Sequence, residues 1–75
     1  MTPESRAAAT VARALGIQGG VVPEADMASL SAWDSMSHVT LLLELEQELG
    51  RPLTAEEVAS IDSVRAVARL FGAAG

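Results

Sequence analysis

The sequence predicts an all-α fold, a four-helix bundle with a long first loop and a short third helix. The 75 residues are 49% hydrophobic but include one Phe, one Trp and no Tyr, so the core must be aliphatic. No alternating run of Val, Ile, Thr and aromatic residues indicates a strand. Instead, apolar residues recur at helical spacing in segments that begin at capping residues and end at Gly or Pro.

The first helix is predicted from Pro3 to Leu15. Thr2 is the expected N-cap, and proline suits the first helical position because an N–H there would lack an intrahelical partner. Gly16 is the expected stop. The apolar face comprises Ala8, Val11 and Leu15.

Residues 17–33 show no sustained helical period. Gly19, Gly20 and Pro23 interrupt any helix, and a connection of this length is unusual in a compact domain. We expect the loop to be pinned across the helices by Val21, Val22, Met27 and Leu30.

The second helix is predicted to follow Asp34 as N-cap and to end at Leu49, before Gly50 and Pro52. Ser35 then takes the first helical position, with its hydroxyl toward solvent. The predicted inward stripe is Val39, Leu42, Leu45 and Leu49, widened by Leu41. The predicted solvated face is Ser37, Thr40, Glu44, Gln47 and Glu48.

The third helix is short, with Thr54 and Glu57 forming a capping box and an end near Ser60. Ile61 is expected to be a buried joint. Asp62 or Ser63 caps a fourth helix whose apolar face is Val64, Val67, Ala68 and Phe71. The expected organisation is a single domain over residues 1–75, with a core of about 3–71 and a flexible tail of 72–75.

Charge and composition exclude several classes of function. The formal net charge is −5 and lysine is absent, which argues against nucleic acid and anionic membrane surfaces as partners. Without cysteine, and with one histidine, no disulfide, thiolate chemistry or multi-histidine metal site is expected. No leader pattern or membrane-length apolar run appears. We therefore expect a cytoplasmic, monomeric protein without membrane insertion.

Ser35 is the residue of greatest chemical interest. The free N–H groups and the dipole at a helix start favour an anion there, such as a phosphoester. His38 is near enough in sequence to be considered as a base, but a hydrolytic serine also needs an orienting group, an oxyanion hole and a cleft. No G-x-S-x-G elbow is present. From position alone, Ser35 could also begin a helix without being modified, in a helical interaction module.

Several segments together resemble the acyl carrier protein family. They are Asp34-Ser35-Met36, the long loop before it, the helix from Val39 to Gly50, and Ile61-Asp62-Ser63-Val64. The family signature is Asp-Ser-Leu followed by an apolar helix that ends in Leu-Glu-x-Glu-Phe-Gly. The resemblance covers about Val11 to Phe71.

This resemblance implies a carrier protein without catalytic activity of its own. A phosphopantetheinyl transferase would attach 4′-phosphopantetheine from coenzyme A to Ser35, and the arm's thiol would hold an acyl or aminoacyl group as a thioester. Asp34 matches the acidic neighbour that helps the transferase place its metal and coenzyme A. The other implied partners are a loading enzyme and acceptor enzymes.

The sequence departs from the family around this site. Ala32-Trp33-Asp34 replaces the usual Gly-x-Asp or Gly-Leu-Asp, and Met36 replaces leucine. Ser37 and Thr40 fall where fatty-acid carriers are usually acidic, so partners that dock through Arg and Lys should bind weakly. This favours a dedicated secondary pathway, polyketide-like or aminoacyl, over the alternatives of a D-alanyl-type or fatty-acid carrier. The predicted docking residues are Trp33, Met36, Ser37, Thr40, Leu43 and Gln47.

Three neighbouring features have alternative interpretations. Trp33 is either a packing anchor for the loop or a partner contact. His38 is either a hydrogen-bonded boundary residue or part of an entrance for the arm. The glutamates of the second helix are expected to be solvated and could dock a basic partner; they are Glu44, Glu46 and Glu48.

Overall fold

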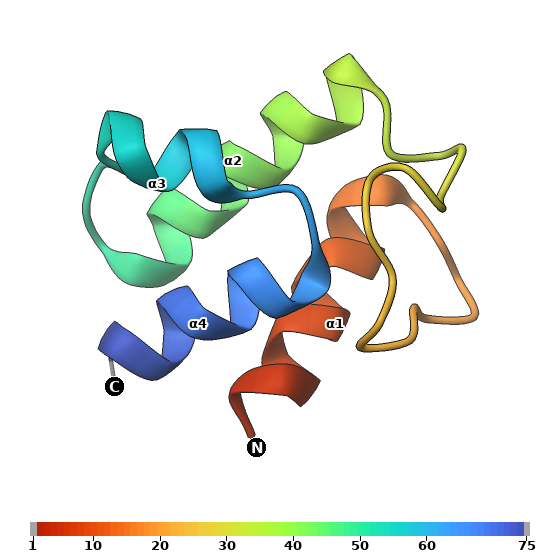
Figure 1. The fold of residues 1–75 in the computed structure, drawn as a ribbon, viewed down its shortest axis with the longest axis horizontal. Coiled ribbons are helices and arrows are strands. Elements are labelled where there is room, and N and C mark those ends of the chain that lie inside the picture. Colours follow the sequence, from red (N-terminus) through yellow and green to blue (C-terminus); the bar gives the residue numbers. More distant parts are fainter. Residues whose placement is uncertain (1, 75) are drawn as a thin grey trace.

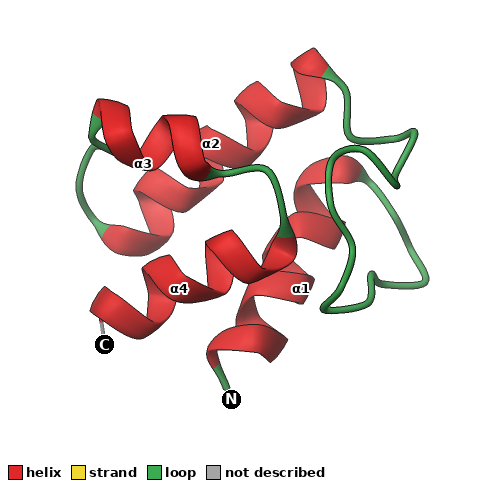
Figure 2. Ribbon diagram, in the orientation of Figure 1, coloured by secondary structure: helices red, strands yellow, loops and turns green. Residues whose placement is uncertain are grey.

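The computed structural model describes residues 2–74 and contains four α-helices. They are α1 (Pro3–Leu15), α2 (Ser35–Leu49), α3 (Ala55–Ser60) and α4 (Val64–Ala74). Within the described residues the extended pairing is limited to one isolated antiparallel bridge between Asp26 and Ser63. The predicted all-α fold, with its long first loop and short third helix, is confirmed (Figures 1 and 2).

The core lies between α1, α2 and α4. Helix α1 packs against both of the other long helices, whereas α3 is short and lies beside α2 (Figure 1). The long loop (residues 16–34) folds over the side opposite α3. The innermost side chains are largely aliphatic, as predicted, and include Ala7, Val11, Leu41, Leu45, Val64, Val67 and Phe71.

The helix caps follow the sequence closely. The Thr2 hydroxyl accepts a hydrogen bond from the backbone N–H of Ser5 at 3.0 Å, and Gly16 ends α1 with a left-handed φ of 71°. Gly50 ends α2 in the same way, with φ 72°. Ser63, rather than Asp62, caps α4, because its hydroxyl accepts from the N–H of Ala66 at 3.1 Å.

Helix α4 is longer than the sequence predicted. Residues 72–75 were expected to form a flexible tail, but the helix continues through Ala74; residue 75 lies outside the described part of the chain. Alanine is the strongest helix former, and one glycine costs a helix only about 1 kcal/mol relative to alanine. The Pro3 ring also lies 4.0 Å from the position that a Cβ on Gly72 would occupy, so α1 supports this last turn.

Two backbone hydrogen bonds fasten the long loop to the segment before α4. The N–H of Met27 donates to the carbonyl of Asp62 at 2.8 Å, and the N–H of Val64 donates to the carbonyl of Ala25 at 3.0 Å. Three of the four predicted anchors pack against the core, namely Val21, Met27 and Leu30. The fourth, Val22, is 62% exposed, so that prediction was wrong.

The inward face of α2 differs from the predicted stripe. Leu41 and Leu45 are fully buried and Leu42 and Leu49 are half-buried, but Val39 is 55% exposed. The helix carries apolar residues around most of its circumference, so their spacing alone does not define which side faces the core. In the observed orientation of α2, Glu44 and Glu48 form ion pairs with arginines of α1.

Helices α1 and α2 are joined by a cluster of ion pairs. Arg13 lies 2.8 Å from a carboxylate oxygen of Glu44 and 3.0 Å from one of Glu48. Arg6 lies 2.7 Å from the other oxygen of Glu48, and its guanidinium is 4.1 Å from the centre of the Phe71 ring. Glu44 and Glu48 were predicted to form a solvated face, but they bind α1.

The cap of α3 makes the fold sensitive to acid. The Glu57 carboxylate accepts hydrogen bonds from both terminal nitrogens of Arg51, at 2.9 and 2.8 Å, and from the N–H of Thr54 at 2.8 Å. The Arg51 contact is the main cause that lowers the pKa of Glu57 from 4.5 to about 2. Because the folded-state pKa is the lower one, the stabilisation is complete above about pH 4.5 and is lost as the pH falls through about 2.

We therefore predict that in Glu57→Gln the free energy of unfolding falls less steeply with decreasing pH than in the wild type. Glutamine can still complete the capping box, so the variant removes the charge with little change to the cap. Urea unfolding measured between pH 6 and pH 2 should show a smaller loss of stability for the variant than for the wild type. Glu56→Gln, in the same helical turn, is the matched control and should retain the wild-type slope. Equal slopes for wild type and Glu57→Gln would contradict the prediction.

Candidate functional site

Ser35 is the first residue of α2, and it is exposed. No hydrogen bond involves its hydroxyl within the described residues. The first N–H groups of a helix lack intrahelical acceptors, so the surroundings of Ser35 carry partial positive charge. The hydroxyl is therefore accessible, and its position suits a covalently attached anion.

Asp34 is the N-cap of α2, as predicted. Its carboxylate oxygen Oδ1 accepts a hydrogen bond from the backbone N–H of Ser37 at 2.9 Å, and its carbonyl accepts from the N–H of His38 at 2.9 Å. The hydrogen bond from the Ser37 N–H is the largest cause that lowers the pKa of Asp34. A negative charge therefore lies directly before Ser35 at neutral pH.

Trp33 is a packing anchor. It is 3% exposed, belongs to the core, and its backbone N–H donates to the carbonyl of Leu30 at 3.0 Å. The predicted partner contact at Trp33 is wrong, because the side chain faces the interior. The tryptophan instead fixes the end of the long loop immediately before Asp34 and Ser35.

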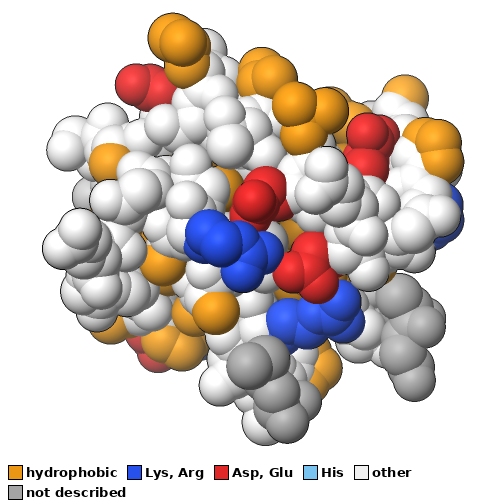
Figure 3. Space-filling view, turned by 180° about the vertical axis from the view of Figure 1, so that it is seen from behind, with side chains coloured by type: hydrophobic (Ala, Val, Ile, Leu, Met, Phe, Trp, Pro, Cys, Tyr) orange, Lys and Arg blue, Asp and Glu red, His pale blue; other side chains and the backbone are white. Residues whose placement is uncertain are grey.

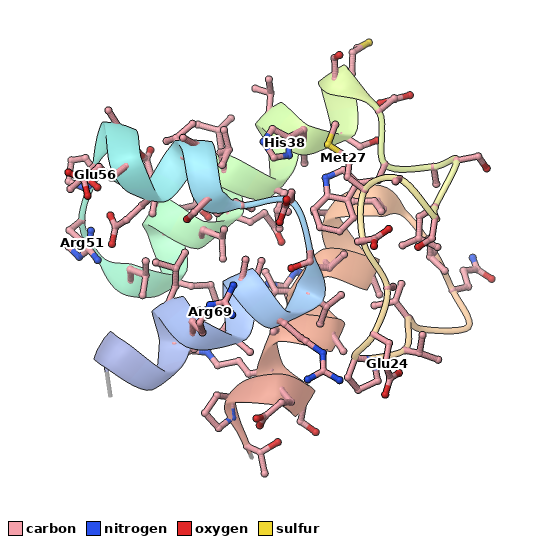
Figure 4. All side chains as sticks on the ribbon, viewed as in Figure 1. Glu24, Met27, His38, Arg51, Glu56 and Arg69 are labelled. Carbon is pink, nitrogen blue, oxygen red and sulfur yellow. The ribbon has the colours of Figure 1, made fainter. Side chains whose placement is uncertain are left out.

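His38 is a hydrogen-bonded boundary residue, which was one of the two interpretations of this position. Its Nδ1 accepts a hydrogen bond from the indole Nε1 of Trp33 at 3.0 Å, and the two rings are tilted by 31° with centroids 6.3 Å apart. The neutral ring therefore carries its proton on Nε2. In a serine hydrolase, Nδ1–H instead donates to an orienting carboxylate. Figure 4 shows His38 on the side of α2 that faces Met27 of the long loop.

The outward side of α2 presents most of the predicted docking residues. Met36 is 82% exposed and Leu43 is 58% exposed, while Thr40 and Gln47 are also exposed and Ser37 is half-buried. Val39 belongs to this surface as well, although its helical spacing had assigned it to the core. Val39 lies five residues after the N-cap, and nothing in the sequence around it indicated whether its side chain faces the core or the solvent.

A hollow lies on the loop side of the site. It is lined by Asp26, Met27, Ala28, Trp33 and Asp62. No group of three or more His, Cys, Asp or Glu side chains in the described part of the chain could hold a metal ion. Likewise, none of the helices over residues 2–74 has the length and apolar character needed to cross a membrane.

Comparison with known protein families gives a match over most of the chain. The family described as "Phosphopantetheine attachment site" matches the chain over residues 5–71, which includes α2, α3 and most of α1 and α4. Searches among curated proteins and among solved structures give no match.

Proposed function

Because the chain belongs to the phosphopantetheine-attachment family, which includes the acyl carrier proteins, we propose that Ser35 is the residue that bears its 4′-phosphopantetheine. Members of this family are carrier domains without catalytic activity of their own, and they work with a phosphopantetheinyl transferase and partner enzymes. The attached group supplies a terminal thiol that holds an acyl or aminoacyl cargo as a thioester. The chain itself has no cysteine.

The observation that carries this proposal is the exposed Ser35 hydroxyl at the first position of α2. Three of the other serine hydroxyls are engaged locally: that of Ser29 bonds with Asp26, that of Ser60 donates to Glu57, and that of Ser63 caps α4. A phosphodiester on Ser35 would be stabilised by the free N–H groups and the dipole at the N-terminus of the long helix α2. The residues present therefore fit the group.

Asp34 has a second role in this proposal. Its Oδ1 caps α2, and its ionised carboxylate stands beside Ser35. We assign the carboxylate to the transfer step, in which it helps the transferase place its metal ion and coenzyme A next to the serine. The support is the family's acidic residue at this position together with the lowered pKa of Asp34.

The cargo is assigned to a dedicated secondary pathway, polyketide-like or aminoacyl. The support is the neutral outward side of α2, where Met36, Thr40, Leu43 and Gln47 carry no charge. Fatty-acid carriers commonly present acidic residues on this helix to basic partners. Loading assays with purified adenylating enzymes and ketosynthases test the aminoacyl and polyketide-like pathways. An assay with a D-alanyl-activating enzyme tests the alternative of a D-alanyl-type carrier.

Intact-mass spectrometry tests the attachment site directly. After incubation with coenzyme A and a broad-specificity phosphopantetheinyl transferase, the wild type should gain one phosphopantetheine and Ser35→Ala should gain none. Ser31→Ala, which changes an exposed serine of the long loop, is the control and should be modified like the wild type. Asp34→Asn keeps an N-cap but loses the charge, so its modification should be slower. An unmodified wild type, beside a control carrier that the transferase modifies, would contradict the proposal.

A further inference from the structure

The start of α2 projects beyond the core. None of residues 35–40 is buried, and the first buried side chain of the helix is Leu41. Both apolar residues of this segment are largely exposed, Met36 by 82% and Val39 by 55%. Figure 1 shows the start of α2 at the upper edge of the molecule, and apolar side chains protrude at the same edge in Figure 3. Buried side chains therefore do not hold the turn that carries Ser35.

Three hydrogen bonds at the start of α2 are local. Oδ1 of Asp34 accepts from the N–H of Ser37, and the carbonyl of Asp34 accepts from the N–H of His38. The Thr40 hydroxyl donates to the carbonyl of Met36 at 3.3 Å. These bonds join residues of the cap and the first turns, so they shape the turn without connecting it to the core.

The hydrogen bond between Trp33 and His38 makes that connection. The indole N–H donates to Nδ1 of His38 at 3.0 Å, and the two residues are five positions apart, so the bond spans the segment that contains Ser35. Trp33 is 3% exposed, belongs to the core cluster, and donates its backbone N–H to the carbonyl of Leu30. The indole is therefore a fixed point, and His38 ties the first turn of α2 to it.

The acceptor on His38 matters because the indole of Trp33 is buried. A buried donor that loses its acceptor costs more free energy than an ordinary hydrogen bond contributes. Without Nδ1, the indole N–H is satisfied only where water reaches it. Water reaches it when the end of the long loop and the start of α2 move apart, so loss of this bond changes the position of Ser35.

We propose that His38 is a positioning residue for phosphopantetheine attachment: by accepting the indole N–H of Trp33, it holds the first turn of α2 against the core and keeps Ser35 where a transferase can engage it. The inference rests on the proposed attachment at Ser35. In this role His38 acts through Trp33 and the backbone, not by contact with the reacting atoms. A carrier without the bond occupies the competent arrangement for a smaller fraction of the time, which lowers its apparent affinity for the transferase.

Two substitutions at His38 separate the acceptor from the rest of the side chain. His38→Asn places an amide oxygen close to the position of Nδ1, and asparagine and histidine have similar helix propensities. His38→Leu keeps a side chain of comparable size but has no acceptor. The transferase assays are run at about pH 8, where histidine side chains are ordinarily neutral.

His38→Leu should raise the KM for the carrier about fivefold with little change in kcat, because one ordinary hydrogen bond changes an equilibrium by about that factor. His38→Asn should stay close to the wild-type KM. Val67→Ala is the control for stability, since it truncates a fully buried side chain in α4 and leaves the bond in place. This control should lower the free energy of unfolding and keep the wild-type KM.

The single tryptophan gives a direct signature of the bond. In heteronuclear NMR spectra, the one indole N–H signal should exchange slowly with solvent in the wild type, in His38→Asn and in Val67→Ala. It should exchange faster, at a shifted position, in His38→Leu, because the donor is then satisfied by water. Unchanged exchange in His38→Leu would contradict the role of the acceptor.

A double-mutant cycle with Trp33→Phe, which also removes the bond, tests whether the two residues act together. His38→Leu should raise the KM in the wild-type background and cause little further rise in Trp33→Phe. A wild-type KM for His38→Leu, an equal rise for His38→Asn or Val67→Ala, or additive effects in the cycle would overturn the inference while leaving attachment at Ser35 intact. Failure of the wild type to accept any phosphopantetheine would instead overturn the proposed function.

Discussion

Trp33→Ala is expected to lower the free energy of unfolding by about 3–5 kcal/mol, the usual range for removing a buried aromatic side chain. The indole is 3% exposed, packs within the core and donates a hydrogen bond to His38. Domains of this size are stabilised by only about 4–11 kcal/mol in total, so the variant should be close to unfolding. Urea titration followed by circular dichroism is the suitable measurement, because the variant lacks the single tryptophan.

Trp33→Phe provides the control for this variant. It keeps an aromatic ring in the core and removes the hydrogen bond to His38, so it should cost much less, about 1 kcal/mol from the hydrogen bond with a further amount from imperfect packing. Because Trp33 fixes the backbone just before Ser35, Trp33→Ala should also slow phosphopantetheine transfer. A loss of stability below about 1 kcal/mol for Trp33→Ala would contradict the anchoring role.

Leu41→Ala is expected to cost about 2–5 kcal/mol, the range for truncating a fully buried leucine. Leu41 is 0% exposed and lies at the centre of the inward face of α2. The matched variant is Val39→Ala on the outward face, which should change the stability by no more than about 0.5 kcal/mol. Parallel urea titrations of the two variants compare the faces directly. If Val39→Ala proved as costly as Leu41→Ala, the described orientation of α2 would be wrong.

The features that sequence reasoning predicted well are local. Thr2, Asp34 and Thr54 each cap a helix through an N–H only three residues away, so the pattern that forms the contact is contiguous in the chain. The same holds for the glycines that end α1 and α2. The place of Ser35 as the first residue of α2 was predicted in the same way, from the cap at Asp34.

The features that sequence reasoning missed depend on distant residues. The side of α2 that faces inward could not be read from Leu41, Leu42 and Leu43, because any of the three could meet the core. The ion pairs between α1 and α2 join residues that are 31 to 42 positions apart in the sequence. No pattern within α2 alone predicts them. The burial of Trp33 was one of two open alternatives, since an amphipathic indole suits both a core and an interface.

Helix α3 contains no buried residue, in contrast to the other helices. It is held by its capping box, by the pair between Arg51 and Glu57, and by the buried Ile61 that follows it. Segments with few buried contacts open locally at a lower free energy than the whole domain unfolds. The two backbone hydrogen bonds between the long loop and the start of α4 do not involve α3. Local opening of α3 therefore does not require these two hydrogen bonds to break, and we expect α3 to open more readily than the other helices.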